Sequence, residues 1–368
     1  MAYDLAGAVT SEATLAAAAR LAEEVLASRA EAADRAFAPE AETFRALLDG
    51  GFAGLIVAPE FGGLGADDAT CHAVSEVLGG ACGVTHFTLH QHWSACRFIQ
   101  QGNNEPLKRR ALPKLASGAW LTGVGFSHLR RSGPPVVRAV EIPDGWRLSG
   151  VIPWFSGWGL YRYGVLAAKL PDLRELFVFT SVTEPTVVAS LPMALCAMQG
   201  SATVTLTLDQ HFVSREQTCF IGEVDWLRKR DRVNLVQHAY NPLIVAAASV
   251  RLLRRIAEQR ANATIARTAD ALGAELADLR ERVDFWACDE STTRTDYFEG
   301  AMATRTGAIT LAVRAAHAAV VASAGAANAL SHPAQRRFRE AMFYSIQGQT
   351  QDVMEATLRT IAKSTHLG

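Results

Sequence analysis

Alanine and leucine recur at helical spacing through the first third of the chain. Apolar residues return every three or four positions in TLAAAARLAEEVLASRAEAADRA and in AETFRALLDGG. A glycine-rich loop, VAPEFGGLGADD, separates these from two further amphipathic stretches, DDATCHAVSEVLGGAC and THFTLHQHWSACRFIQQG. The segment EPLKRRALPKLASGAW completes the block. The pattern predicts a helical domain over residues 1–120.

The pattern changes to short β-like runs between residues 121 and 225. These runs are rich in β-branched and aromatic residues: LTGVGFSHL, PVVRAVEI, GWRLSGVIPWF, GVLAAKL, ELFVFTSV, TVVASL and ATVTLTLD. Turns such as SGPP, PDG and PDLRE separate them. Several short strands at regular spacing predict a compact, barrel-like sheet domain.

Helical spacing returns over residues 226–368. We expect helices over 234–265, 267–289, 301–330 and 333–364, with breaks at DESTTRTDYFEG and NALSHP. The predicted fold class is therefore α+β and mainly α. Its order is an N-terminal helical domain, a middle β domain and a C-terminal helical bundle.

Two of the C-terminal helices carry apolar residues on more than one face. The stretches are LIVAAASVRLL in 234–265 and AITLAVRAAHAAVVASAGAA in 301–330. A helix that is apolar all round must be buried, and one bundle cannot easily hide two of them. We therefore expect the protein to self-associate through its last domain.

Composition and charge favour a soluble globular protein. Half of the residues are hydrophobic, a fifth are charged, and the 36 basic and 37 acidic residues leave a net charge of −1. This balance gives no electrostatic case for nucleic acid or an anionic membrane. We expect no transmembrane helix and no secretory signal peptide. The six cysteines show no CxxC and no metal-ligand spacing, which fits a reducing compartment, and we expect a cytoplasmic protein.

Few motifs point directly to chemistry. His86 and His90 lie four residues apart, as zinc ligands can, and His92 is close by, but no third ligand stands at useful spacing. Histidines that line a pocket or are hydrogen-bonded in the core are the favoured interpretation. The sequence contains no GxSxG, no P-loop and no GxGxxG after a strand. Each cysteine has apolar neighbours, so inert core thiols are expected.

The segment PWFSGWG, residues 153–159, is more informative. Its aromatic residues Trp154, Phe155 and Trp158 flank Ser156 at the end of a predicted strand. Such rings can stack on a planar ligand while the serine hydroxyl donates or accepts a hydrogen bond. A tryptophan-rich sheet corner that packs on a helix explains the pattern equally well.

The segment YSIQGQTQ places Gln347, Gln349 and Gln351 inside a stretch that otherwise reads as a helix. Buried amides are costly unless their donors and acceptors find partners. The glutamines therefore either line a polar cavity or mark a solvent-exposed helix start.

Taken together, the segments resemble the acyl-CoA dehydrogenase superfamily. The resemblance rests on GFAGLIVAPEFGGLGADD, SEVLGG, LPKLASGAW, GWRLSGVIPWFSGWG, MQGSATVTLTLDQHFV and HPAQRRFREAMFYSIQGQTQDVMEATLR, which occur in the family's order over nearly the whole chain. It implies a helical domain, a small β domain and a four-helix bundle. It also implies FAD, an acyl thioester or similar substrate, and dimers or tetramers.

The resemblance assigns flavin contacts to individual residues. Trp154 would lie against the isoalloxazine, with Phe155 beside it, and Ser156 would hydrogen-bond near flavin N5. Phe126, Ser127 and His128 stand where the family has Thr-Glu-Pro. The Thr-Glu-Pro at Thr183–Pro185 lies in the wrong strand. Arg260 is the nearest candidate for the basic residue that holds the FAD pyrophosphate, although no Phe-Gly follows it, and only Gly325 stands at the family's glycine pair.

The same resemblance places the catalytic base of the dehydrogenases at Gln347. Some members carry the base on the first bundle helix, where this chain has Tyr240 and Asn241. An amide cannot accept a proton near neutral pH. Substitute bases would be His90, His92, His128 or Glu340.

Three functions remain open at this stage. The first is a flavin-dependent oxidoreductase acting on an acyl thioester, with an electron-transfer flavoprotein as a partner. The second is a monooxygenase that uses reduced flavin and O₂ with a separate flavin reductase. That chemistry needs no α-proton base. The third is a flavin-free, non-catalytic homologue that serves as a binding or scaffold subunit.

Overall fold

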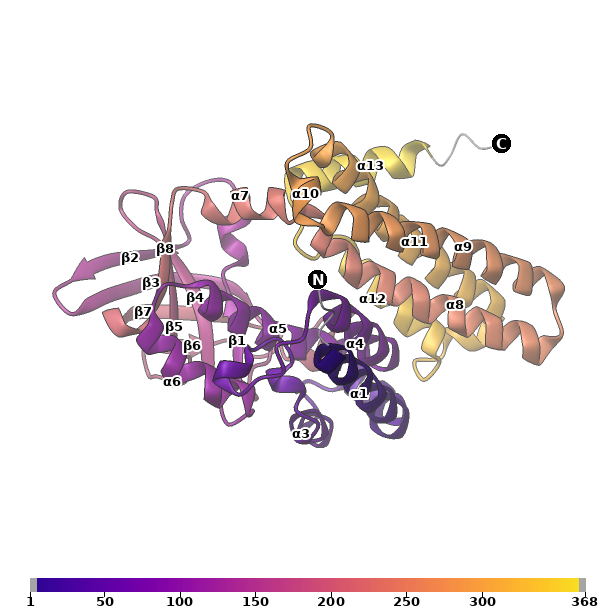
Figure 1. Ribbon diagram of the computed structural model, residues 1–368, viewed down its shortest axis with the longest axis horizontal. Helices are drawn as coiled ribbons and strands as arrows, with labels where there is room; N and C mark the ends of the chain where they lie inside the picture. Colours follow the sequence, from indigo (N-terminus) through magenta and orange to yellow (C-terminus); the bar gives the residue numbers. More distant parts are fainter. Residues whose placement is uncertain (1–4, 364–368) are drawn as a thin grey trace. The chain divides into compact units, whose positions relative to one another are not determined.

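A computed structural model describes residues 5–363, and the chain divides into two compact units, Met1–Arg228 and Lys229–Gly368 (Figure 1). The first unit contains both the predicted helical block and the predicted β block. The second contains the C-terminal helices. Each unit is described by itself.

Helices form the first half of unit one, as the apolar spacing predicts. They are α1 (Leu5–Leu21), which continues through a π-helical turn (Ala22–Leu26) into α2 (Ala27–Arg35), then α3 (Ala41–Asp49), α4 (Asp68–Ala81), α5 (Gly83–Gln101) and α6 (Glu105–Ala116). Side-chain caps begin three of them. Glu40 accepts from the N–H groups of Glu42 and Thr43, Asp67 from that of Thr70, and Asn104 from that of Leu107. Such caps satisfy backbone donors that the helix leaves unpaired.

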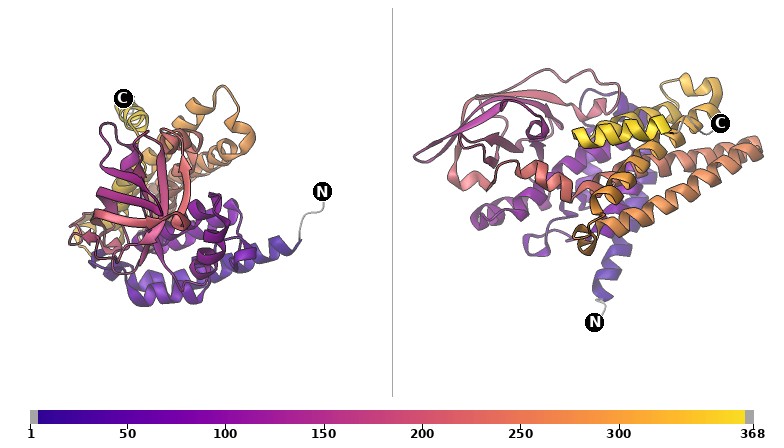
Figure 2. Two further views of the ribbon diagram at one scale, coloured as in Figure 1. Left: turned by 90° about the vertical axis from the view of Figure 1, so that its left-hand side faces the viewer. Right: turned by 90° about the horizontal axis from the view of Figure 1, so that it is seen from above.

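An eight-stranded sheet forms the rest of unit one (Figures 1 and 2). Its strands are β1 (Thr122–Gly125), β2 (Val137–Ile142), β3 (Gly145–Phe155), β4 (Tyr163–Lys169), β5 (Glu175–Ser181), β6 (Val187–Ala189), β7 (Val204–Ser214) and β8 (Thr218–Gly222). The order is β6-β7-β3-β2-β4-β5-β8, with β1 parallel to β4. The predicted strands are all present. β8, from TCFIG, was not predicted.

The helices and the sheet of unit one share an apolar core. Phe98 of α5 stacks on Phe126 after β1, with ring centroids 4.4 Å apart, and also contacts Phe177 of β5. Leu112 of α6 is fully buried in the same cluster. A core that draws on both blocks explains why no unit boundary falls near residue 120.

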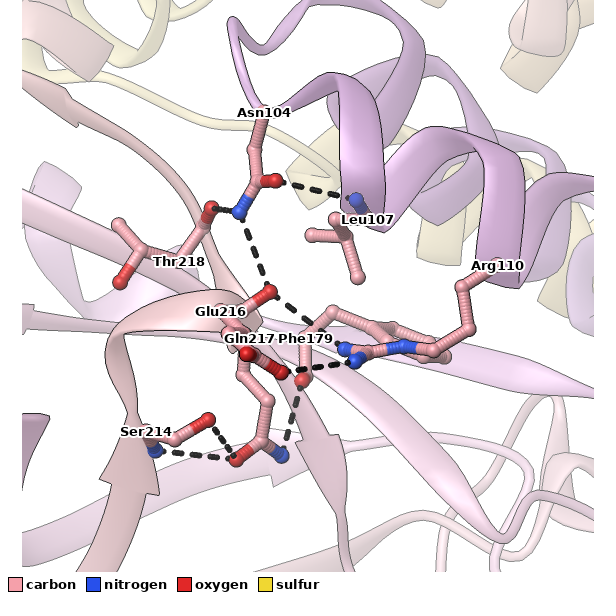
Figure 3. Close-up of polar contacts among 8 residues, drawn as sticks. All are labelled: Asn104, Leu107, Arg110, Phe179, Ser214, Glu216, Gln217 and Thr218. Atoms are coloured by element: carbon pink, nitrogen blue, oxygen red, sulfur yellow. Dashed lines mark hydrogen bonds and ion pairs between the residues drawn. The ribbon is translucent and has the colours of Figure 1, made fainter.

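Polar contacts also bind α6 to the turn before β8 (Figure 3). The Asn104 amide donates to the carbonyl oxygens of Glu216 (3.1 Å) and Thr218 (2.8 Å), while its Oδ1 caps the helix at Leu107 (3.0 Å). Arg110 reaches the same turn through Glu216. One asparagine thus starts a helix and holds a strand that is distant in sequence.

Unit two is a helical bundle, as predicted. After α7 (Trp226–Val233) and a 3-10 turn (Leu235–Ala239) come α8 (Tyr240–Arg260), α9 (Ala263–Ala287), α10 (Asp289–Thr292), α11 (Tyr297–Ser323), α12 (Pro333–Ile346) and α13 (Gln351–Lys363). The helices α8, α9, α11 and α12 pack on one another as a four-helix bundle, and α13, drawn in yellow in Figures 1 and 2, contacts α11. The order of helices, sheet and helices is therefore confirmed.

Two predicted helices are wrong in their extent. The expected helix 333–364 is two helices, because the chain turns at residues 347–350, where Gly348 has a φ of +61°. The expected helix 234–265 ends at Arg260. There Ala261 takes a φ of +46° and the Asn262 side chain accepts from two backbone N–H groups to start α9. The break within 333–364 was not predicted, and the break between α8 and α9 was predicted about five residues too late.

Helix α8 is largely buried within the single chain, so its all-round apolar character does not by itself call for a second subunit. The stretch Tyr297–Asn328, which contains α11, is long and apolar enough to cross a membrane by length and composition, which the sequence prediction did not anticipate. Within it, 44% of the most apolar window is buried, and Val321 is 66% exposed. Its Arg305 is buried and donates hydrogen bonds to the backbone carbonyls of Gln347 and Gly348.

Candidate functional site

The end of β3 presents one tryptophan outward. Trp154 is 45% exposed, whereas the next ring, Phe155, is fully buried in the core, as strand alternation requires. Trp158 packs against that same core. The interpretation as a packed sheet corner therefore holds for Trp158, and the stacking of a planar ligand on Trp154 stays a prediction. Trp158 belongs to a packed sheet corner, and Trp154 offers a free indole face.

Ser156 lies beside this exposed ring and is 9% exposed. Its Oγ is 2.7 Å from Thr203 Oγ1, which in turn is 2.9 Å from Ser201 Oγ. The N–H of Gly157 donates to the carbonyl of Ser201 at 2.6 Å. Gly157 has a φ of +92°, and a Cβ there would collide with the ring of Tyr161 at 2.1 Å. The chain is thus fixed tightly around the serine.

The segment that replaces Thr-Glu-Pro follows β1. Phe126 is a core residue, Ser127 is half-buried, and His128 is buried. Neither ring nitrogen of His128 makes a hydrogen bond to another described residue, and burial lowers its pKa to about 4. The rings of Phe126 and Phe155 face the core, so any cofactor contact from these two positions falls to their backbone groups.

The three histidines of α5 occupy two environments, one with His92 and the other with His86 and His90. His92 is fully buried, accepts a hydrogen bond from the Thr122 N–H at Nδ1 (3.3 Å), and lies 3.6 Å from Cys96 Sγ at Nε2. His86 and His90 face each other, with ring centroids 5.9 Å apart. Burial lowers the pKa of His86 to about 3, and those of His90 and His92 to about 4. Among the described residues, no group of three candidate ligands could hold a metal ion.

In unit two, Gln347 ends α12 and is held from two sides. Its side-chain Oε1 accepts a hydrogen bond from Asn241 Nδ2 at 2.9 Å. The buried Arg305 donates to the backbone carbonyls of Gln347 (3.2 Å) and Gly348 (2.8 Å). The two positions at which the resemblance places a catalytic base therefore lie together, and both carry neutral amides.

The other two glutamines behave as surface residues. Gln349 is exposed, and Gln351 is exposed and donates to Glu355 at 2.9 Å within α13. Glu340, considered as a substitute base, is buried and paired with Arg337 at 2.7 Å and Arg336 at 3.8 Å. The carboxylate of Glu340 is thus already engaged by two guanidinium groups.

Arg260 is exposed at the end of α8. The turn that follows it carries an open pocket of about 470 Å³, lined by small residues and by the polar side chains of Arg254, Glu258, Asn262 and Asp270. The assignment of Arg260 to a pyrophosphate stays a prediction.

The residues at the end of β3 fit a planar heteroaromatic cofactor. The exposed indole of Trp154 provides a stacking surface, and the hydroxyl of Ser156 has one hydrogen-bond partner among the described residues, Thr203. One hydroxyl can make up to three hydrogen bonds, so Ser156 retains capacity for a ligand atom.

The comparisons with known proteins find similarity to acyl-CoA dehydrogenases. The family model for the acyl-CoA dehydrogenase N-terminal domain matches residues 10–119. Benzylmalonyl-CoA dehydrogenase of Aromatoleum aromaticum is 24% identical over 92% of this chain and 94% of its own. The structure of butyryl-CoA dehydrogenase from Megasphaera elsdenii superposes with a TM-score of 0.83 at 19% identity, covering 98% of this chain and 100% of that one. Residues 10–119 thus match the acyl-CoA dehydrogenase N-terminal domain family, and the whole chain is similar in fold to acyl-CoA dehydrogenases.

A further member of this fold is the acyl-CoA dehydrogenase from Geobacillus kaustophilus, with a TM-score of 0.80 at 15% identity over 95% of this chain and 97% of that one. These similarities confirm the resemblance drawn from the ordered segments. Several contacts were beyond sequence reasoning. These are the pairing of Asn241 with Gln347, the contacts of Arg305, and the partners of Ser156. Each joins residues far apart in the chain, and no local pattern announces it.

Proposed function

We propose that this protein is a flavin-dependent oxidoreductase that binds FAD and acts on an acyl thioester or a related small substrate. The observation that carries the proposal is the exposed indole of Trp154 beside the Ser156 hydroxyl at the end of β3. The names of the similar proteins, a benzylmalonyl-CoA and a butyryl-CoA dehydrogenase, support the substrate class. When bound, the flavin would supply the redox chemistry, and the chain's residues would bind and orient it.

The paired amides of Gln347 and Asn241 stand where the dehydrogenases carry their catalytic base, and this difference affects the expected reaction. Removal of an α-proton by a positioned base contributes about 10²–10⁴-fold to a rate. Gln347 and Asn241 cannot accept that proton, but they can hold each other and orient a carbonyl or hydroxyl group. We therefore expect slow desaturation of simple saturated acyl-CoAs.

The first test is the visible absorbance of the purified protein. We expect flavin bands that weaken in Trp154→Ala, because the ring contact contributes about 0.5–1.5 kcal/mol beyond burial. Trp158→Phe, a change in a core-packed ring, is the matched control and should keep the flavin. A colourless protein that takes up no added FAD would overturn the proposal and favour the flavin-free homologue.

A second candidate function is a monooxygenase that takes reduced flavin and O₂. The paired amides at both base positions favour it, since that reaction needs no α-proton base. Mixing the flavin-loaded protein with a panel of acyl-CoAs without oxygen separates the two. Bleaching of the flavin supports the dehydrogenase and an electron-transfer flavoprotein as partner. Persistent colour, with turnover only when a flavin reductase and O₂ are added, supports the monooxygenase.

We further propose a cytoplasmic homo-oligomer. The absence of structural disulfides supports a reducing compartment, since all six cysteines are free. The exposed apolar residues of the last two helices support self-association, as argued in the Discussion.

A further inference from the structure

We infer that Ser201 and Thr203 fix the direction of the Ser156 proton, so that Ser156 presents a hydrogen-bond donor to the cofactor. Thr203 is then a positioning residue. The inference rests on the proposed flavin site and concerns residues that no motif marks. Two observations support it: the three hydroxyl groups form a short chain, and the two ends of this chain, Ser201 and Ser156, are buried to different extents.

Three hydroxyl groups, those of Ser156, Thr203 and Ser201, form a hydrogen-bonded chain. Ser156 Oγ is 2.7 Å from Thr203 Oγ1, and Thr203 Oγ1 is 2.9 Å from Ser201 Oγ. Ser201 is fully buried, Thr203 is 3% exposed and Ser156 is 9% exposed. The Gly157 N–H to Ser201 carbonyl bond, at 2.6 Å, and the Trp158 N–H to Ala202 carbonyl bond, at 3.3 Å, hold the two segments against each other.

Three protons serve two hydrogen bonds in this chain, so one O–H group is left over. If Ser156 and Ser201 both donated to Thr203, the leftover O–H would be that of Thr203, which is 3% exposed. If Ser156 donated to Thr203 and Thr203 to Ser201, the leftover O–H would belong to Ser201, which is fully buried and whose hydroxyl has only Thr203 as a partner among the described residues. An unsatisfied buried donor is costly. If Ser201 donates to Thr203 and Thr203 to Ser156, the leftover O–H is that of Ser156, at the most exposed end.

The arrangement in which Ser201 donates to Thr203 and Thr203 donates to Ser156 is therefore favoured. In it, the O–H of Ser156 is free to act as a hydrogen-bond donor to a ligand. Successive hydrogen bonds also polarise one another, which strengthens the terminal donor. Oxidised flavin has a lone pair at N5 and accepts a hydrogen bond there, whereas reduced flavin has an N–H and donates one. A preset donor at Ser156 thus favours binding of the oxidised form over the reduced form.

Thr203→Val tests this inference, since it removes the hydroxyl and keeps the branched shape. The probe is FAD, titrated in its oxidised form and, without oxygen, in its reduced form, together with the midpoint potential of the bound flavin. We expect affinity for oxidised FAD to fall at least threefold while affinity for reduced FAD changes less than twofold. A tenfold change in this ratio corresponds to an upward shift of about 30 mV for a two-electron couple.

Two controls separate positioning from structure. Thr203→Ser keeps the hydroxyl and should restore both affinities and the potential. Thr180→Val removes another buried threonine hydroxyl of the same sheet, which is 3.0 Å from His211 Nε2, and should leave the ratio of the two affinities unchanged. If Thr203→Val fails to fold, Thr203→Ala removes the same hydroxyl with a smaller side chain.

The outcomes distinguish the inference from the proposed function. Equal loss of affinity for both flavin forms, or an unchanged ratio in a variant that still binds flavin, overturns the inference alone. A parent protein that binds neither form overturns the inference and the proposed function together. A selective loss for the oxidised form, restored by Thr203→Ser, supports both.

Discussion

At the residue scale, the informative feature is a hydrogen bond between two neutral side chains. Gln347 and Asn241 are 106 positions apart, yet Asn241 Nδ2 donates to Gln347 Oε1 at 2.9 Å. The resemblance predicted that each residue occupies a base position. It did not predict that they meet, because tertiary packing of α8 against α12 makes the contact. The pairing gives Gln347 a definite rotamer, with its amide N–H₂ group left for other partners.

Gln347→Glu is predicted to create acyl-CoA-dependent reduction of the bound flavin. Glutamate is nearly isosteric with glutamine, and its oxygen can still accept from Asn241. A carboxylate at this position can accept the α-proton, which the amide cannot. We expect the anaerobic rate of flavin bleaching by a saturated acyl-CoA to rise at least about tenfold, which is less than the roughly 10²–10⁴-fold that an optimally placed general base contributes.

The control for this variant is Gln351→Glu, a change at an exposed glutamine that bonds only within α13. It should behave as the parent does. Fast bleaching by the parent that is unchanged in Gln347→Ala would contradict the prediction and place the base elsewhere. His90 and His128 would then be examined before His92, whose two ring nitrogens already contact Thr122 and Cys96.

At the element scale, the break between α12 and α13 depends on one glycine. Gly348 has a φ of +61°, and a Cβ there would lie 2.9–3.4 Å from atoms of the His238 ring. Gly348→Ala should therefore lower the free energy of unfolding by at least about 1–2 kcal/mol, the cost of a left-handed conformation for a residue with a side chain. Urea denaturation of the variant measures it.

Gly325→Ala is the matched control. Gly325 is also near the end of a bundle helix, but a Cβ there would have no neighbour within 4 Å and its φ is not positive. Gly325→Ala should leave the free energy of unfolding unchanged or raise it slightly, because alanine reduces the conformational entropy of the unfolded chain. Equal stability of the two variants would show that the turn tolerates a side chain.

The buried histidines of α5 predict a pH dependence of stability. Burial lowers the pKa of His86 to about 3, while an unfolded histidine titrates near 6.5. Well above pH 6.5, His86 is neutral in both the folded and the unfolded state, so it adds no pH dependence to the free energy of unfolding. As the pH falls from 6.5 toward 3, His86 becomes protonated in the unfolded chain but stays neutral in the folded protein. The free energy of unfolding therefore falls by up to about 1.4 kcal/mol per pH unit.

His86→Phe should remove this part of the slope and cost little at pH 7, because neither ring nitrogen of His86 has a partner among the described residues. Urea denaturation at several values between pH 6.5 and 4.5 checks it. Ile99→Val, another buried change on α5, should lower stability by about 0.5–1.5 kcal/mol at every pH without altering the slope. An unchanged slope in His86→Phe would contradict the prediction.

Sequence patterns predicted the regular elements well and their ends poorly. The stretch GWRLSGVIPWF is β3 from its first residue to its last, since alternation and the flanking turns define a strand locally. The end of α12 depends on contacts of residues 347–348 with Arg305 and His238, which lie elsewhere in the sequence. Likewise, Trp154 and Trp158 look alike in the sequence, and only the folded sheet shows which one is packed.

At the scale of the whole molecule, the three blocks seen in the sequence become two compact units. The change from helices to strands after α6 is real, but Phe98, Phe126 and Phe177 join helix and sheet in one core. A domain boundary requires few contacts across it, and a change in residue pattern does not measure contacts. The division at residues 120 and 121 therefore stays a prediction about sequence organisation.

Self-association is the prediction that belongs to this scale, and the structure changes its basis. The apolar face of α8 is covered within the chain, whereas α12 and α13 each leave an apolar stripe exposed. The stripes consist of Phe338, Met342 and Ile346 on α12, and of Met354, Leu358 and Ile361 on α13, each 40–59% exposed. Spacings of three and four residues place each set on one helix face.

Monomeric proteins rarely leave apolar patches larger than a few hundred Å² open to water. We therefore expect a second copy of the chain to cover these stripes, and light scattering on a sizing column at micromolar concentration should give the mass of a dimer or tetramer. Met342→Glu combined with Leu358→Glu should shift the protein to the mass of a single chain, because each carboxylate would have to be desolvated in the interface. Val188→Glu, at a 58% exposed position of the sheet, is the control and should leave the mass unchanged. A parent that elutes as a monomer would refute self-association, and a double variant that keeps the parent's mass would locate the interface away from α12 and α13.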